Sequence, residues 1–244
     1  MRTRTTRSTH THSPRLLRIA ALFSMPLDRK REMGRARLAR ACSQTMELLG
    51  PRRHDSPHVH ARGITLIHGA SGSGKSTLLR AIARECAARR LRVRRVEMPR
   101  SAREGHPQRD HRTIVDLSRL QLATWLRTLA SCGLADAALL AQRPHELSTG
   151  QAWRLALALA LARSLSLSRA PTRPTTPTIL IIDELCAGLD DITARGLCRT
   201  LRRAAHDNLV IFAATSSPDR LRHALAPERE VEIISMEGKS CTGS

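Results

Sequence analysis

The sequence of 244 residues contains no tyrosine, two phenylalanines and two tryptophans. Its only lysines are Lys30, Lys75 and Lys239, so arginine carries nearly all the positive charge behind the formal net charge of +20. A coding bias toward arginine produces the same composition, and the charge alone therefore does not indicate a nucleic-acid partner. No apolar run approaches the length of about 18 residues that spans a bilayer. We therefore do not expect the chain itself to form a membrane channel, and a membrane role would require a partner.

Closely spaced cysteine pairs are also missing. The six cysteines are scattered along the chain at positions 42, 86, 132, 186, 198 and 241, with no CxxC pair and no histidine at ligand spacing. This pattern favours buried, reduced thiols in a cytosolic protein over a zinc site or a disulfide framework.

The N-terminal quarter is strongly basic. Residues 1–62 contain fourteen arginines and lysines and four acidic residues. We expect a disordered extension, which is typical of basic segments with few aromatics. The opening residues 1–23 are rich in Arg, Ser and Thr and contain no acid, a composition that also describes an organellar transit peptide, whereas their short apolar run ending at Phe23 does not suit a secretory signal. Residues 63–244 would then form the main domain.

Strand-like and helix-like patterns alternate after this extension. Short apolar runs at residues 64–67, 91–96, 179–182 and 208–215 are of strand length, and helical patterns separate them. Residues 113–140 predict two helices with a glycine hinge, within a helical insert of about 113–165, and a Pro- and Thr-rich spacer covers 170–178. This order predicts an α/β fold with a largely parallel sheet flanked by helices.

The segment GASGSGKS, residues 69–76, lies between a predicted strand and a predicted helix. It matches the phosphate-binding loop, in which glycines bring backbone N–H groups close to phosphate oxygens and the next helix adds its positive end. In this loop Lys75 would reach the β- and γ-phosphates, and the Ser76 hydroxyl would bind Mg²⁺. The predicted phosphate contacts are Gly69, Ala70, Ser71, Gly72, Ser73, Gly74, Lys75, Ser76 and Thr77.

Two acids end the apolar run ILIIDE. Asp183 follows the predicted strand directly, where a carboxylate can support Mg²⁺, and Glu184 is placed to polarise an attacking water. Two carboxylates at the end of a buried strand require a compensating cation. Beside a phosphate loop, they predict a nucleotide site more strongly than a solvated turn.

Three motifs in this order resemble the ATP-binding cassette (ABC) ATPases: GASGSGKST, the signature-like LSTGQ, and IIDELCAGLD, over roughly residues 63–235. The resemblance implies a P-loop NTPase with a small helical subdomain that carries the signature. It also implies Mg-ATP hydrolysis at composite sites of a head-to-tail dimer, each closed by the signature of the opposite subunit. Asp190 would then lie at the dimer interface and couple the two sites.

The signature is followed directly by a run of alternating leucine and alanine. Both residues are strong helix formers, so we expect a buried helix despite the strand-like alternation. Ser148, Gly150 and Gln151 would stand at its amino end, where the helix dipole favours an anion. Arg154 is interpreted either as the arginine that commonly follows the signature or as a solvated helix charge.

Several positions depart from the family pattern. Ser216 stands where a histidine usually follows the last core strand, and a serine hydroxyl can bond a γ-phosphate but cannot carry charge. Hydrolysis would then be slow or use another group. The glutamine of the family's Q-loop is either Gln108 or Gln121, with Gln108 preferred by order. The usual aromatic residue that stacks on adenine is missing, which leaves His60 or Arg62.

We therefore expect an ATPase that works as a homodimer or with a paired ABC subunit, in the cytoplasm or peripheral to a membrane. A membrane subunit and a nucleic acid held by the basic N-terminal segment are the candidate partners. An ATP-gated binding module with little turnover is the alternative function. A P-loop small-molecule kinase would not explain LSTGQ or the Leu-Asp turn.

Overall fold

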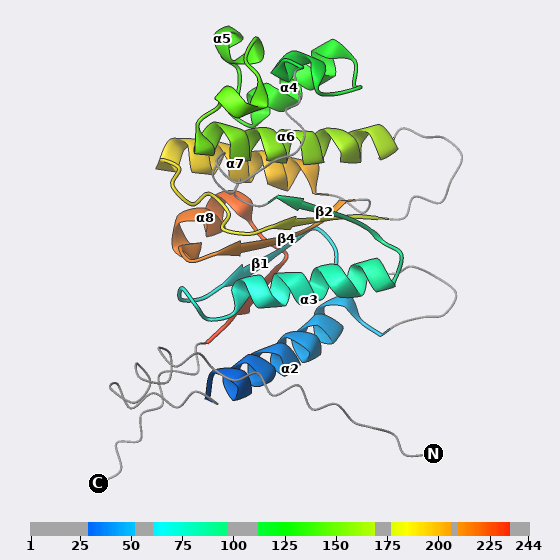
Figure 1. Cartoon of the computed structure of the whole chain (residues 1–244), viewed down its shortest axis with the longest axis vertical. Coiled ribbons are helices and arrows are strands. Elements are labelled where there is room, and N and C mark those ends of the chain that lie inside the picture. The colour runs from blue at the N-terminus through cyan, green and yellow to red at the C-terminus, as the bar shows by residue number, and fades with distance from the viewer. Residues whose placement is uncertain (1–28, 52–60, 97–111, 169–176, 206–208, 235–244) are drawn as a thin grey trace, which may run out of the picture. The chain divides into compact units, whose positions relative to one another are not determined.

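The computed structural model describes residues 29–51, 61–96, 112–168, 177–205 and 209–234 (Figure 1). The chain divides into two compact units, residues 1–40 and 41–244. The described part of the first unit is the beginning of helix α2 (Arg29–Leu49). The second unit contains the end of α2 and the remaining elements. Within the described ranges, no helix has the length and hydrophobicity needed to cross a membrane.

The second unit is built on one parallel sheet. Its five strands, in the spatial order β2-β3-β4-β1-β5, are β1 (Ile64–His68), β2 (Arg92–Val96), β3 (Thr178–Ile182), β4 (Leu209–Thr215) and β5 (Arg229–Glu232). The last residue of β1, His68, pairs in register with Thr215, the last residue of β4. Ile182 at the end of β3 pairs with Ala213. The parallel α/β architecture expected from the sequence is confirmed.

Helices cover both faces of this sheet (Figure 1). One face carries α3 (Lys75–Ala88) and the end of α2, and the other carries α6 (Thr149–Ser168), α7 (Asp191–Ala204) and α8 (Pro218–Leu225). The helical insert before α6 consists of η1 (Ile114–Asp116), α4 (Leu122–Ser131), α5 (Ala137–Leu140) and η2 (Pro144–Glu146). As expected, α4 and α5 are separated at Gly133, which has a positive φ of 75°.

The central strands are buried on both sides, as parallel strands between helical layers are. Successive side chains of β4 alternate between two apolar clusters: Leu209, Ile211 and Ala213 pack under α6 and α7. Val210, Phe212 and Ala214 pack against α2 and α3. Strand β3 alternates in the same way. This two-sided burial explains why these strands appear in the sequence as continuous apolar runs.

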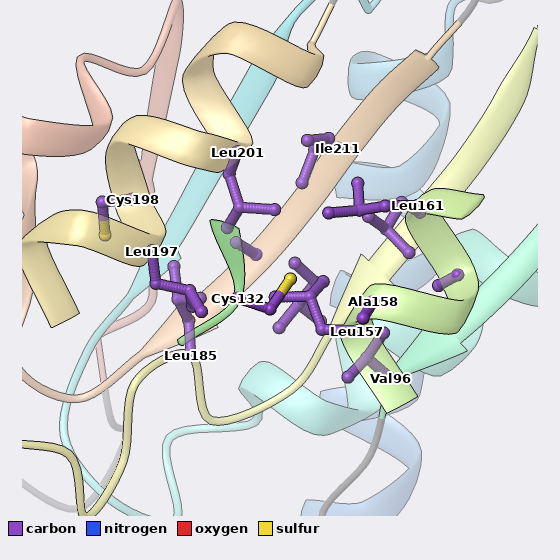
Figure 2. Packing of buried hydrophobic residues seen from close by; sticks show 14 of the residues in the cluster. Val96, Cys132, Leu157, Ala158, Leu161, Leu185, Leu197, Cys198, Leu201 and Ile211 are labelled. Atoms are coloured by element: carbon purple, nitrogen blue, oxygen red, sulfur yellow. The ribbon is translucent and has the colours of Figure 1, made fainter. Parts of the chain in front are cut away.

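The alternating leucine and alanine run forms helix α6, as predicted. Leu157, Ala158 and Leu161 of α6 lie in one cluster with Leu201 of α7 and Ile211 of β4 (Figure 2). From Trp153 to Ser164 every residue of this helix except Arg163 is buried or half-buried. A helix enclosed on most sides needs no polar stripe, which is why the sequence shows no helical periodicity here.

The predicted disordered extension must be corrected at residues 29–49, which form α2. Leu48 is 2% exposed and Leu49 is fully buried, both within the cluster beneath α3. The guanidinium of Arg89 donates hydrogen bonds to the carbonyls of Leu49 and Gly50, at 3.1 and 2.6 Å, and so satisfies the end of the helix. The main domain therefore begins near Ala41 rather than residue 63. Residues 1–28 and 52–60 lie outside the described ranges.

Two smaller expectations also change. Of the predicted spacer 170–178, only residues 177 and 178 are described, and Thr178 already belongs to β3. The expectation of buried thiols holds for Cys86, Cys132, Cys186 and Cys198, which are free and buried. Cys42 is exposed, because it lies on the outer side of α2, and Cys241 lies outside the described residues.

Candidate nucleotide-binding site

Three groups of predicted site residues follow the carboxyl ends of three neighbouring parallel strands. The phosphate loop follows β1, the acidic pair follows β3, and Ser216 follows β4. In Figure 1 the arrowheads of β1 and β4 and the amino end of α3 all lie on the left of the view. Ligands of open α/β sheets bind in crevices at this edge. The topology therefore brings together motifs that are more than a hundred residues apart in the chain.

The phosphate loop is an open backbone cradle. Gly69, Gly72 and Gly74 have positive φ angles of 147°, 76° and 113°, conformations that favour glycine. A Cβ on Gly69 would lie 2.3 Å from the backbone oxygen of Ile233, so a side chain there is sterically excluded. By contrast, a Cβ on Gly72 or Gly74 would meet no atom within 4 Å. The space over these two glycines is where a phosphate can approach the backbone N–H groups.

Helix α3 begins at Lys75 with free donors. Its N-cap, Gly74, makes no side-chain hydrogen bond, and its first turn contains no acidic residue. The first N–H groups of a helix lack internal acceptors and carry the positive end of its dipole. The Lys75 ammonium donates to the carbonyls of Gly69 and Ala70, both at 2.8 Å. Ammonium and helix end together provide a site that fits a phosphate group.

The loop after β3 has an unusual backbone. Glu184 and Cys186 are non-glycine residues with φ of 53° and 60°, and such conformations are strained and cluster at functional sites. Asp183 is half-buried and accepts a hydrogen bond from the Glu184 amide at 3.1 Å, while the Glu184 side chain is exposed. The Leu185 amide donates to the Ala214 carbonyl at 2.7 Å and ties the loop to β4. The strained turn thus fixes the backbone position from which the Glu184 side chain extends.

A cavity of about 320 Å³ lies between these loops. It brings together Lys75 of the phosphate loop, Glu184 of the acidic pair and Ser216 after β4. Ser71 and Arg220 also line it. A carboxylate, an ammonium group and a hydroxyl in one cavity are suited to phosphoryl-transfer chemistry. The other predicted residues of the phosphate loop do not line this cavity.

The residues predicted to bind Mg²⁺ supply few ligands by themselves. Among the described residues, no group of three or more His, Cys, Asp or Glu side chains gathers into a metal cage. This suits Mg²⁺, which keeps several waters and is commonly held by one or two protein oxygens together with substrate phosphates. Ser76 at the start of α3 and Asp183 at the end of β3 have the required oxygen chemistry, so the site fits a phosphate-bound Mg²⁺.

The signature-like segment forms the amino end of α6. The Ser148 amide donates to Oε1 of Gln151 at 2.9 Å, and the Gln151 amide donates to Oγ of Ser148 at 3.3 Å. These two bonds are a capping box, a structural role that the sequence reasoning missed although the S-x-x-Q spacing signals it. A Cβ on Gly150 would meet nothing within 4 Å. None of the three residues lines the cavity with Lys75 and Glu184.

Two further predicted residues have structural partners. Asp190 is the N-cap of α7 and accepts from the Thr193 amide at 2.8 Å, a backbone hydrogen bond that lowers the pKa of its carboxyl group. Nη1 of Arg154 donates to the Gly133 carbonyl at 2.9 Å, so this arginine joins α6 to the turn after α4 and is not merely solvated. Arg154 packs closely against Gly133, since a Cβ on Gly133 would lie 2.8 Å from Nη1 of Arg154.

The structure gives less support to the candidates for the Q-loop glutamine and for the residue that stacks on adenine. Gln121 is the N-cap of α4, without a side-chain capping bond, and Arg62 is exposed. Gln108 and His60 lie outside the described residues. The sequence reasoning did not select Arg220, which lines the cavity from α8. Its only sequence signal is that it follows Ser216 by four residues.

The thiol of Cys186, in the loop after Glu184, interacts with the thiol of Cys198 on α7. A hydrogen bond with Cys198 is the main cause that raises the pKa of the Cys186 thiol, followed by burial. The same bond lowers the pKa of Cys198. The guanidinium of Arg220 lies close to this loop, because it donates to the Leu189 carbonyl, and its positive charge opposes the rise in the pKa of Cys186.

Comparison with solved structures returned ATP-binding cassettes. The dimeric post-hydrolysis state of one cassette, bound to ADP and Pi, is 20% identical, with 72% of this chain and 84% of that chain covered and a TM-score of 0.47. A nucleotide-free cassette from an ABC transporter is 15% identical, with 72% and 79% covered and a TM-score of 0.49. CbiO1 from Clostridium perfringens, part of the transporter complex cbiONQ, is 19% identical, with 70% and 78% covered and a TM-score of 0.41.

Comparison with curated protein sequences gave no match. A family model does match, and its extent includes the end of α2, the phosphate loop, the acidic pair and most of β4. This model describes an AAA ATPase domain and covers residues 43–212. The match spans more than half of the chain and contains the residues that form the cradle and the strained acidic turn. The chain therefore belongs to the AAA ATPase domain family.

Proposed function

We propose that the chain is an ABC-type ATPase that binds Mg-ATP between two copies arranged head to tail and hydrolyses it. The cavity that contains Lys75, Glu184 and Ser216 carries this proposal. It combines a cation for the phosphates, a carboxylate for the attacking water and a hydroxyl near the terminal phosphate. The family match supports an ATPase domain, and the LSTGQ segment favours the ABC type.

Each residue has a role that its position supports. The open amides of Gly72 and Gly74 and the amino end of α3 would hold the phosphates, and Lys75 would exchange its bonds to loop carbonyls for bonds to phosphate oxygens. Ser76 and Asp183 would hold Mg²⁺, which neutralises phosphate charge when bound. Glu184 would accept a proton from the attacking water. Ser216 would donate a hydrogen bond to the terminal phosphate.

A second copy is needed because this chain does not bring its own signature to its own cavity. Ser148 and Gly150 stand at the exposed amino end of α6, where free N–H groups and the helix dipole favour an anion. In a head-to-tail dimer this end would close over the triphosphate held by the other copy. Asp190, which caps α7 next to the cavity loop, would lie at the contact between the two copies.

The central test uses Glu184→Gln, which keeps the shape of the side chain and removes the base. Phosphate release should fall about a hundredfold, in the range expected for loss of a general base. The variant should accumulate as a dimer in the presence of ATP and Mg²⁺, measured by size-exclusion chromatography with light scattering. ADP should not produce this dimer. Lys75→Ala is the binding control and should remain monomeric with either nucleotide.

Glu184→Gln protein that stays monomeric at saturating ATP would contradict the head-to-tail site. The replacement of the usual histidine by Ser216 favours one alternative, an ATP-gated binding module with little turnover. Wild-type protein that dimerises with ATP but releases no phosphate would identify this alternative.

The process driven by ATP would depend on a partner. We place the protein in the cytoplasm or at the membrane periphery, with either a membrane subunit or a nucleic acid as partner. Co-purification of a membrane protein would support the first. Binding of DNA or RNA that weakens steeply with salt and is lost on removal of residues 1–40 would support the second.

A further inference from the structure

Arg220 is the second cation of the nucleotide cavity. It lies in the first turn of α8, four residues after Ser216, and its side chain is 30% exposed. Of the described residues that line the cavity, Lys75 and Arg220 carry positive charge. Lys75 approaches from the phosphate loop after β1. Arg220 approaches from α8. It is near Ser216, which stands where the ABC family usually has a histidine.

The guanidinium is held by two acceptors on one neighbouring segment. Nε donates to Oδ1 of Asp191, and Nη2 donates to the carbonyl oxygen of Leu189. Both acceptors flank Asp190, at the turn that leads from the acidic loop into α7. The Asp191 carboxylate is 63% exposed, so it orients the arginine without removing it from solvent. Arg220 is therefore fixed in place by the same turn that follows Glu184.

Most of the hydrogen-bonding capacity of this side chain is still available. An arginine has five N–H donors in a planar fork, and the bonds to Asp191 and Leu189 use two of them. The remaining donors belong to a side chain that lines the cavity. Arginine binds phosphate oxygens through such paired, charge-assisted hydrogen bonds, which are stronger than the bond that a neutral serine hydroxyl can make.

We propose that Arg220 recognises the terminal phosphate of ATP and supplies the positive charge that Ser216 cannot. Asp191 and the Leu189 carbonyl act as positioning groups for its guanidinium. This inference rests on the proposed function, and it assigns the selection of a triphosphate over a diphosphate to a residue outside the recognised motifs. Ser216 then contributes a hydrogen bond, while the electrostatic stabilisation of the γ-phosphate comes from α8.

The test compares Arg220→Gln with Arg222→Gln. Arg222 lies two residues further along the same helix, pairs with Asp219 and Glu230, and is not among the residues that line the cavity. Affinities for ATP and ADP are measured separately, by displacement of a fluorescent nucleotide analogue. Arg220→Gln should weaken ATP about tenfold or more and change ADP less than about twofold, as loss of a charge-assisted hydrogen bond predicts. Arg222→Gln should leave both affinities unchanged.

Arg220→Lys provides a second variant in case the glutamine disturbs the packing of α8. Lysine keeps the charge but lacks the planar fork, so its preference for ATP should lie between those of wild type and Arg220→Gln. Asp191→Asn should reduce the ATP preference in the same direction, by less, because the Leu189 carbonyl still holds the guanidinium. Thermal unfolding without nucleotide measures any purely structural effect of each variant.

Two results overturn the inference. If Arg220→Gln keeps the wild-type preference for ATP over ADP, Arg220 does not recognise the terminal phosphate. If it weakens ATP and ADP equally and lowers the unfolding temperature, its role is structural. Both results leave the proposed ATPase intact, because wild type still binds and hydrolyses ATP. Failure of wild type to bind either nucleotide would instead overturn the proposed function and this inference together.

Discussion

Burial in the fold strongly changes the chemistry of the cysteine residues. Cys86 on α3 and Cys132 after α4 are fully buried, and desolvation raises the pKa of each thiol from 9.0 to about 12. Both thiols therefore stay protonated, and unreactive as nucleophiles, well into the alkaline range. The sequence suggested reduced cysteines from their spacing, but only the packing distinguishes these two from the exposed Cys42.

These shifted thiols predict an alkaline loss of stability. Above pH 9 an unfolded thiol ionises, whereas the folded thiols keep their protons until about pH 12. The unfolded state then binds fewer protons than the folded state, so the free energy of unfolding falls as pH rises, by at most about 1.4 kcal/mol per pH unit for each thiol. Chemical denaturation at pH 8, 9.5 and 10.5 measures this slope.

The chain is well suited to this measurement, because it has no tyrosine and three lysines, so few groups other than the remaining cysteines titrate in the same range. Replacing Cys86 and Cys132 by alanine should lower the stability at pH 8 but flatten its decline above pH 9. Cys42→Ala is the matched control and should leave the slope unchanged. An equal slope in the double variant and the wild type would show that other groups cause the decline.

At the scale of elements, the amino end of α6 has one observed role, as a helix cap, and one proposed role, as an anion site. Ser148 and Gln151 cap the helix reciprocally, and Gly150 leaves open space beside the exposed N–H groups. A cap and an anion site make different demands on Ser148. Capping needs any acceptor oxygen, whereas contact with a triphosphate needs an oxygen that is not negatively charged.

This difference gives a prediction with two matched variants. Ser148→Ala removes the cap and should lower the free energy of unfolding by about 1 kcal/mol, the usual cost of a lost N-cap. Ser148→Asp keeps a good capping residue and should preserve stability, but its carboxylate should repel the triphosphate held by a second copy. Denaturation curves and light scattering with ATP, both in the Glu184→Gln background, measure the two effects.

The outcome separates the two roles of the signature. If the Glu184→Gln protein dimerises equally well with ATP whether or not it also carries Ser148→Asp, capping is the only function of Ser148. If Ser148→Asp abolishes dimerisation but leaves stability unchanged, the result would support the proposed contact of Ser148 with the triphosphate held by the second copy.

At the scale of the whole molecule, the position of the domain boundary determines which N-terminal residues can be removed without loss of stability. The end of α2 closes the apolar cluster beneath α3 with Leu48 and Leu49. Arg229 on β5 also forms an ion pair with Glu47 of this helix, at 2.7 Å. The helix segment from residue 41 onward is therefore part of the ATPase fold, although the sequence placed it in a disordered extension.

Two truncations test this boundary. Removal of residues 1–40 should change the free energy of unfolding little, because these residues form a separate compact unit. Removal of residues 1–51 also removes Leu48 and Leu49, and burial of each leucine contributes about 1.5–3 kcal/mol. We expect a loss of about 3 kcal/mol or more, a large share of the usual stability of a domain. Equal stability of the two truncations would show that α2 contributes nothing to the core.

The motifs made much of the site predictable. A phosphate loop needs its glycines, lysine and serine next to each other, so residues 69–77 could be identified without a structure. The strand that ends in Asp183 and Glu184 was also clear, because a parallel strand buried on both faces appears as a continuous apolar run. Helix α6 could be distinguished from a strand by the helix propensity of leucine and alanine rather than by periodicity.

Arg220 and the end of α2 show what could not be predicted. Each depends on packing between distant parts of the chain, which sequence spacing alone does not establish. Arg220 has no motif of its own, and its place in the cavity depends on how α8 packs beside the turn at Leu189 and Asp191. Leu48 and Leu49 follow a basic segment whose average composition concealed their burial.

The sequence by itself determined the chemistry of the phosphate loop, the acidic strand and the order of strands and helices. These properties are local, because they depend on residues that are neighbours in the chain. Only the tertiary structure decided which distant residues share the cavity, where the domain begins and which thiols are protected from water. Those outcomes depend on long-range packing, in which the ends of separate strands and helices meet and exclude solvent.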